Sequence, residues 1–219
     1  MQGCARGCLL WATPAALYVT ALAVLLIAIG PTPIMAPWDV FILLDGAWRI
    51  LSGQIPHTDF HNPIGSMTYF LIAGGMKFSD VSLNGIVYCN VFFLLAVASW
   101  GGLIFFSRLP PAYALLMTLF VATLSVATRP LGYHPSVTTY AMIYNRYAWV
   151  LLILVLVQLF VADGRETKWK NRFDAASVGL LLGFLFFCKI SYFIVGATAV
   201  ALALVLRPRL RITIFLTAA

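Results

Sequence analysis

The sequence predicts an all-α membrane protein: a polytopic bundle of about six transmembrane helices with a truncated seventh. Of its 219 residues, 62% are hydrophobic and only 10% are charged, and the mean hydropathy is +0.96. A soluble domain is nearer half apolar and a quarter charged. Long apolar runs recur along the chain, and basic residues cluster between them. Both patterns are typical of helices that cross a bilayer.

The predicted spans follow these runs. They cover 9–30, 81–106, 110–128, 145–162 and 175–206, and a final run begins at Ile212 and stops at Ala219. As a single helix, 175–206 would be roughly 48 Å long, with Lys189 near its middle. A bilayer core is about 30 Å thick and a charge is costly at its centre. We therefore expect two helices that turn near Lys189.

The weaker run 64–78 is short, rich in glycine and ends in Lys77. These features predict a re-entrant or surface helix rather than a crossing. The distribution of basic residues supports the same topology. With the N-terminus in the cytoplasm, nine basic residues lie inside and four outside, as the positive-inside rule requires. The inner set is Arg6, Arg108, Arg165, Lys168, Lys170, Arg172, Arg207, Arg209 and Arg211, and the outer set is Arg49, Lys77, Arg129 and Arg146.

This topology makes 1–219 one transmembrane domain, with 31–80 as its first outer loop. The net charge of +7 is explained by topology, so the lipid bilayer is the expected partner and nucleic acid is not. The first outer loop opens with proline and ends its first segment with glycine, which predicts a helix over 38–52. Trp38, Phe41 and Trp48 recur at helical spacing, as in a helix lying along the membrane surface.

The same loop carries a family pattern. Asp39 is followed by Ala47, Arg49, Leu51, Gly53, Pro56, the pair Asp59-Phe60, and Pro63. This order resembles the first outer loop of the C-type (GT-C fold) membrane glycosyltransferases, which include the protein O-mannosyltransferases and the lipid A aminoarabinose transferases. Two positions depart from the pattern, because His57 stands where tyrosine is usual and Val40 where glutamate is common.

The resemblance implies an enzyme, or the N-terminal part of one. Such an enzyme transfers a sugar from a polyprenyl-phosphate donor to a glycan, lipid or protein acceptor. The reaction takes place at the extracytoplasmic face, here of a bacterial inner (plasma) membrane. Carried over to this chain, Asp39 is the catalytic residue, either as general base or as ligand of a divalent metal ion. A second interpretation is an acid placed in the first turn of a helix by the helix dipole.

Four further residues are candidates for substrate binding, and each has two interpretations. Arg49 either binds donor phosphate or pairs with the neighbouring Asp45. Asp59 is either functional or a turn former. Arg146 and Lys189 either bind an anion or extend to the membrane surface. We expect Asp39, Arg49 and Lys189 to converge within about 10 Å, a distance comparable to the Debye length.

Two other classes of function remain open. A transporter or flippase would carry charges at mid-bilayer depth and repeated halves, and the runs contain almost no charge besides Lys189. A non-catalytic, truncated membrane protein is the other alternative.

Overall fold

The computed structural model describes residues 2–30, 34–35, 37–61, 64–128, 134, 138–161 and 168–206. Within these ranges the chain is almost entirely helical. The helices are α1 (Gln2–Ile29), α2 (Pro37–Leu51), α3 (Ser66–Lys77), α4 (Asn84–Arg108), α5 (Pro111–Val126), α6 (Ile143–Phe160), α7 (Lys168–Cys188) and α8 (Ile190–Leu206). Two short strands, β1 (Ile34–Met35) and β2 (Thr138–Thr139), pair in parallel.

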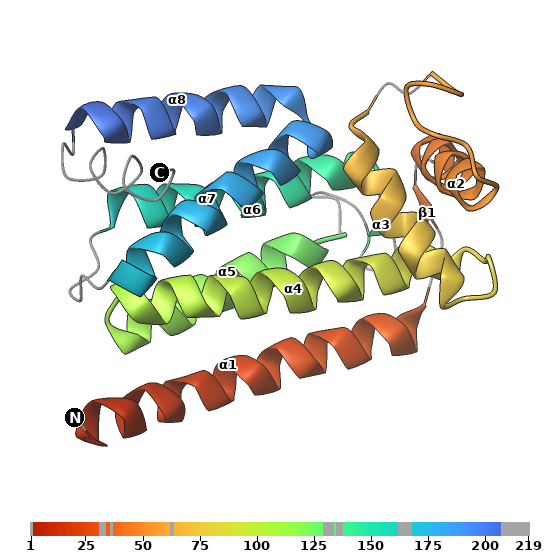
Figure 1. The fold of residues 1–219 in the computed structure, drawn as a ribbon. Coiled ribbons are helices and arrows are strands. Elements are labelled where there is room, and N and C mark those ends of the chain that lie inside the picture. Colours follow the sequence, from red (N-terminus) through yellow and green to blue (C-terminus); the bar gives the residue numbers. More distant parts are fainter. Residues whose placement is uncertain are drawn as a thin grey trace.

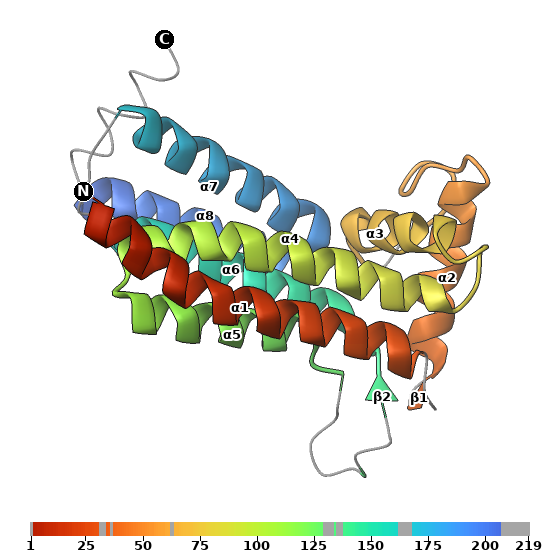
Figure 2. The ribbon, with the colours of Figure 1, turned by 90° about the horizontal axis from the view of Figure 1, so that it is seen from below.

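The helices divide into a bundle and a cap at one of its ends. Figure 1 shows α1 and α4 to α8 running lengthwise beside one another. The short helices α2 and α3 gather at one end, where Figure 2 shows α2 lying crosswise. We call this end, which also holds Lys189, the loop end. The opposite end, with Arg108, Lys170 and Arg172, is called the basic end.

Four helices among the described residues are long and apolar enough to cross a bilayer. They are α1 from Trp11 to Ile29, α4, α6, and α7 from Trp169 to Cys188. Helices α5 and α8 have 16 and 17 residues, which is roughly 24–26 Å and shorter than a bilayer core of about 30 Å. All six expected helices therefore exist, but only four reach the length of a span. The seventh helix expected from Ile212 falls outside the described residues.

The predicted break within 175–206 is confirmed. Helix α7 ends at Cys188 and α8 begins at Ile190, so that Lys189 alone separates them. The Lys189 amide still donates to the Leu185 carbonyl at 2.8 Å, and the Tyr192 amide donates to the Lys189 carbonyl at 3.1 Å. The two helices double back as a hairpin (Figure 1). Helix α7 begins earlier than predicted, because its basic first turns are also helical.

The predicted helix over 38–52 is confirmed as α2. Its proline stands at the first position, where a missing amide hydrogen costs nothing. The chain leaves the helix at Gly53, whose φ of +88° suits glycine. The face with Val40, Leu43 and Ala47 is buried, whereas Trp38, Phe41 and Trp48 are exposed. The aromatic side chains thus point away from the protein, as an interfacial helix requires.

Helix α3 occupies the weak run 64–78. It has 12 residues, or roughly 18 Å, which is too short to cross a bilayer and agrees with the predicted surface helix. It packs closely on its neighbours. A Cβ added at Gly75 would stand 2.1 Å from the Gly85 carbonyl oxygen at the start of α4, and one added at Gly46 of α2 would stand 2.1 Å from the Tyr69 ring. These two contacts fix α2 and α3 over the loop end.

Candidate functional site

The candidate site begins where two distant segments of the chain pair. Strand β1 lies just before α2, and β2 lies just before α6, with Ile34 opposite Thr138 and Met35 opposite Thr139. This pairing brings the first turn of α2 beside the first turn of α6. Asp39 lies in the former and Met142 caps the latter.

Asp39 lies at the N-terminal ends of both helices. Its Oδ2 accepts a hydrogen bond from the Met142 amide at 3.3 Å. Exposed amide groups give a helix N-terminus a partial positive charge, so an acidic residue is well placed where these two helix ends meet. The helix-dipole interpretation of Asp39 is therefore supported, and it is compatible with a catalytic role.

Met142 holds this arrangement in an uncommon backbone conformation. Its φ of +54° is left-handed, which is unusual for a residue with a side chain. Such residues persist where the surrounding structure imposes the conformation, and they cluster at functional sites. Here the left-handed turn aims the amide of Met142 at Asp39.

Asp39 faces a small cavity of about 110 Å³. Its other lining residues come from three elements: Ile42 and Leu43 of α2, Ile64 before α3, and Met142 and Tyr144 at the start of α6. The carboxylate is half-buried. Asp39 does not line the other cavities described in the structure.

Lys189 lies beside Tyr144. Its ammonium donates to the Asn145 side-chain oxygen at 2.7 Å and lies 5.2 Å from the centre of the Tyr144 ring and 5.8 Å from that of Tyr192. These partners are all neutral. The ammonium forms no ion pair with a carboxylate in the described part of the chain, so its positive charge is available to an anion.

Tyr144 connects the two charged residues. It lines the Asp39 cavity, and its ring face is turned to the Lys189 ammonium. Asp39 and Lys189 therefore have Tyr144 as a common neighbour.

Arg146 follows one position after Asn145 in the first turn of α6. Its Nε and Nη2 atoms are buried, and neither has a hydrogen-bond partner. A buried guanidinium without a counter-charge is costly, because both its solvation and its pairing are lost. Of its two interpretations, anion binding explains this cost better than extension into water.

Arg49 does not join the site. It lies ten residues after Asp39 on α2, or roughly 15 Å along the helix axis. Its Nε donates to Asp45 at 2.8 Å, and its guanidinium stacks 5.6 Å from the Phe60 ring. The ion-pair interpretation describes its surroundings, and at 37% and 56% exposure the pair contributes only a few tenths of a kcal/mol.

Asp59 is also separate, and it acts as a turn former. Its Oδ2 accepts from the Ile55 amide at 2.7 Å, while its own amide donates to the Ile55 carbonyl at 2.9 Å. This exposed turn leads into α3, where Tyr69 packs edge-on against Phe60. Burial, followed by the charges of Asp45 and Tyr144, raises the Tyr69 pKa to about 12, so this phenol stays neutral in ordinary buffers.

Few side chains near Asp39 could act with it as ligands of the predicted metal ion. Among the described residues, no group of three or more histidine, cysteine, aspartate or glutamate side chains gathers to hold an ion. A single carboxylate does suit Mg²⁺, which is commonly held by one or two carboxylates together with substrate phosphates and water.

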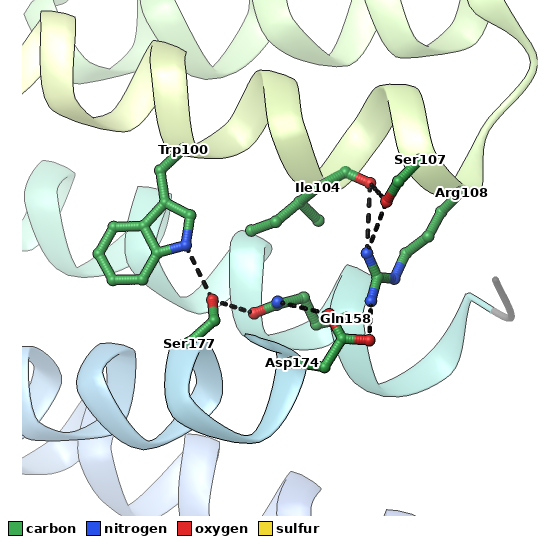
Figure 3. A network of polar contacts seen from close by, with 7 residues as sticks. All are labelled: Trp100, Ile104, Ser107, Arg108, Gln158, Asp174 and Ser177. Carbon is green, nitrogen blue, oxygen red and sulfur yellow. Dashed lines mark hydrogen bonds and ion pairs between the residues drawn. The ribbon is translucent and has the colours of Figure 1, made fainter. Parts of the chain in front are cut away.

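A second polar cluster lies at the basic end, and the sequence interpretation missed it (Figure 3). Arg108 at the end of α4 forms an ion pair with Asp174 of α7, and Asp174 also accepts from Gln158 of α6. Ser177 donates to Gln158 at 2.9 Å and accepts from Trp100 at 2.8 Å. Polar residues inside the apolar runs, Gln158 above all, were the available signal. The cluster ties three helices together far from Asp39.

The fold defines an all-helical bundle with four helices long and apolar enough to cross a membrane. Comparison with known proteins adds no family to this class, because no family model, curated protein or solved structure matches the chain. The likeness to the C-type glycosyltransferases therefore rests on the loop motif alone.

Proposed function

We propose that the chain is an integral membrane protein with the loop end on the extracytoplasmic side. Four span-length helices and an exposed aromatic face on α2 support this placement. The basic end, with Arg108, Lys170 and Arg172, then faces the cytoplasm. Helices α5 and α8 cross with the local membrane thinning or flanking polar contacts that short spans require.

We further propose a glycosyltransferase that takes its sugar from a polyprenyl-phosphate donor and works at the loop end. The observation that carries this proposal is that a carboxylate and an ammonium lie near one side chain: Asp39 lines a cavity with Tyr144, and the Lys189 ammonium lies 5.2 Å from the centre of the Tyr144 ring. A carboxylate and an unpaired ammonium are the two charges that this reaction needs, one for the acceptor and one for the donor phosphate.

The proposed chemistry assigns each charge a role. The acceptor hydroxyl oxygen forms a bond to the anomeric carbon of the sugar, and its proton passes to the Asp39 carboxylate. The bond between that carbon and the phosphate oxygen breaks, and the polyprenyl phosphate leaves with the electron pair. The ammonium of Lys189 stabilises the negative charge on the leaving phosphate. Arg146, whose Nε and Nη2 atoms are buried without a hydrogen-bond partner, is a second cation for the same phosphate. A bound divalent ion would further neutralise this charge.

An apolar groove supports a lipid-linked donor. It has a volume of about 610 Å³ and is lined by α3, α4, α6 and α7, including Met67, Phe92, Leu151 and Phe187. Phe187 lies two residues before Lys189, so one lining residue of the groove is close in the chain to the proposed phosphate-binding cation. A hydrocarbon tail loses its exposure to water in such a groove.

The test compares wild type with Asp39→Asn in vesicles supplied with polyprenyl-phosphate sugars. We expect the variant to lose activity by roughly 10²–10⁴-fold, the contribution of a general base. Asp45→Asn is the matched control, because Asp45 lies on the same helix but its carboxylate is exposed and paired with Arg49. Equal activity in the Asp39 variant and in wild type would refute the catalytic assignment.

A further inference from the structure

The cavity at Asp39 is too small for the proposed reaction. Its volume is about 110 Å³, whereas sites for small organic ligands usually occupy about 300 Å³ or more. Tyr144 is one of the residues that line this cavity, and its ring lies beside the Lys189 ammonium. At least one lining residue has to move before a donor can reach the carboxylate.

The surroundings of Tyr144 make it the residue best able to move. The structure gives its phenol oxygen no hydrogen bond to a described residue, and the side chain is only half-buried. The ring lies beside the Lys189 ammonium, whereas the Cys188 thiol donates to the Tyr144 backbone carbonyl and so does not hold the side chain.

Tyr147, one turn further along α6, provides a comparison, because its side chain is fixed by its neighbours. Its ring stacks on Phe93 with centroids 3.8 Å apart, and its hydroxyl donates to Asn90 at 3.2 Å and contacts the Cys89 sulfur at 3.4 Å. It is fully buried. In helix α6, Tyr147 is therefore fixed by stacking and hydrogen bonding, whereas the Tyr144 side chain contacts the Lys189 ammonium.

We propose that Tyr144 is a gate between Asp39 and Lys189, and that an anionic phosphate opens it by taking the ammonium away from the ring. This inference rests on the proposed function and adds how access to its site is controlled. A phosphate pairs with an ammonium more strongly than an aromatic face does, because it carries full negative charge. Once the ring rotates away, the Asp39 cavity gains the volume that the ring had occupied.

Two consequences are measurable. In the closed state Leu43, which is 1% exposed and lines the cavity, is shielded from water. A closed gate also weakens apparent phosphate affinity by the fraction of molecules that are open. Removing the ring should therefore expose position 43 and tighten phosphate binding together.

The experiment uses the full chain in lipid nanodiscs with Leu43→Cys as a probe, and mass spectrometry reads thiol modification at that position alone. Tyr144→Ala is compared with Tyr144→Phe, which keeps the ring. Tyr192→Ala is the matched control, because Tyr192 also faces the ammonium but does not line the Asp39 cavity. Binding of a short-chain polyprenyl phosphate without sugar is measured on the same variants without the cysteine.

We expect Tyr144→Ala to react roughly tenfold faster at position 43 and to bind polyprenyl phosphate roughly tenfold more tightly, since an always-open site removes the closed fraction. Tyr144→Phe and Tyr192→Ala should leave the modification rate unchanged. An unchanged rate in Tyr144→Ala, with normal phosphate binding, overturns the gate and leaves the proposed function standing. Failure of every variant and of wild type to bind polyprenyl phosphate overturns the proposed function and the phosphate-driven opening with it.

Discussion

The Asn145 side-chain oxygen lies 2.7 Å from the Lys189 ammonium, and the two residues are 44 positions apart in the chain. Asn145 stands in the first turn of α6, and Lys189 is the one residue between α7 and α8. The contact orients the ammonium without neutralising it. A neutral partner leaves the positive charge of Lys189 uncompensated, as the proposed binding of a donor phosphate requires.

This contact predicts that Asn145→Asp impairs phosphate binding although it barely changes the shape of the side chain. A carboxylate at the same distance would form an ion pair with Lys189 and compete with the phosphate. We expect about a tenfold loss of affinity for polyprenyl phosphate, which corresponds to 1.4 kcal/mol. Isothermal titration in nanodiscs measures it. Asn171→Asp, near the basic end, is the control, and an equal loss there would point to net charge instead of a local pair.

Gly65 should not tolerate a methyl group. Its backbone has ordinary extended angles, so alanine meets no conformational strain. The added Cβ, however, would stand 2.1 Å from the Phe187 carbonyl oxygen and 2.5 Å from that of Cys188. We expect Gly65→Ala to push the end of α7 away and to lower the midpoint of thermal unfolding by several degrees.

Gly74→Ala provides the comparison for Gly65. No atom lies within 4 Å of a Cβ added there, and alanine favours a helix interior by roughly 0.5–1 kcal/mol over glycine. Thermal unfolding of this variant should be unchanged or shifted upward. If both variants lose stability equally, the close packing of Gly65 on α7 is not the cause.

The ion pair at the basic end should stabilise the bundle more than its exposed counterpart on α2. The Arg108 side chain is 2% exposed and that of Asp174 is 26% exposed. Asp174→Asn would leave a buried guanidinium without a counter-charge, at a cost of about 3 kcal/mol in the free energy of unfolding. Asp45→Asn should cost at most a few tenths of a kcal/mol.

Denaturant titration in micelles compares these two variants. A double variant, Arg108→Met with Asp174→Leu, is expected to recover much of the loss, because apolar residues can replace a buried pair. Equal stability of Asp174→Asn and wild type would show that Arg108 is solvated by other means.

The proposed topology predicts that Thr58 and Thr167 are reached from opposite sides of the membrane. Single cysteines at these positions should react with a membrane-impermeant reagent in intact cells at position 58, and only after permeabilisation at position 167. The reason is the inner excess of basic residues. Modification of both positions from the same side contradicts the model.

The positions of the helices could be predicted from the sequence, but most of the contacts between side chains of different helices could not. Hydropathy and charge locate α1 and α4 to α8 because lipid imposes long apolar segments, and the charge of Lys189 locates the turn between α7 and α8. Asp39 was predicted as a candidate because it stands at the head of a helix within a loop pattern that resembles a known family, and this role stays a prediction.

Contacts between distant residues carry no such local signal. The sequence around Met142 does not predict its left-handed backbone conformation. The sequence around Asn145 does not predict its hydrogen bond with Lys189. Arg49 matched a family pattern, and its surroundings follow the other of its two interpretations, the ion pair with Asp45 on the same helix. The partner of Arg108 was missed because Asp174 lies in the first turns of α7, which the sequence interpretation assigned to a connecting loop.

The pairing of β1 with β2 also has a consequence for how the protein is made. Asp39 and the Met142 amide are 103 positions apart, so α2 leaves the ribosome long before α6 can meet it. During synthesis Asp39 is therefore made before the Met142 amide that it contacts in the folded protein. The cation arrives later still, with the α7–α8 hairpin. The carboxylate and the ammonium can be assembled into one site only after almost every described helix has been inserted.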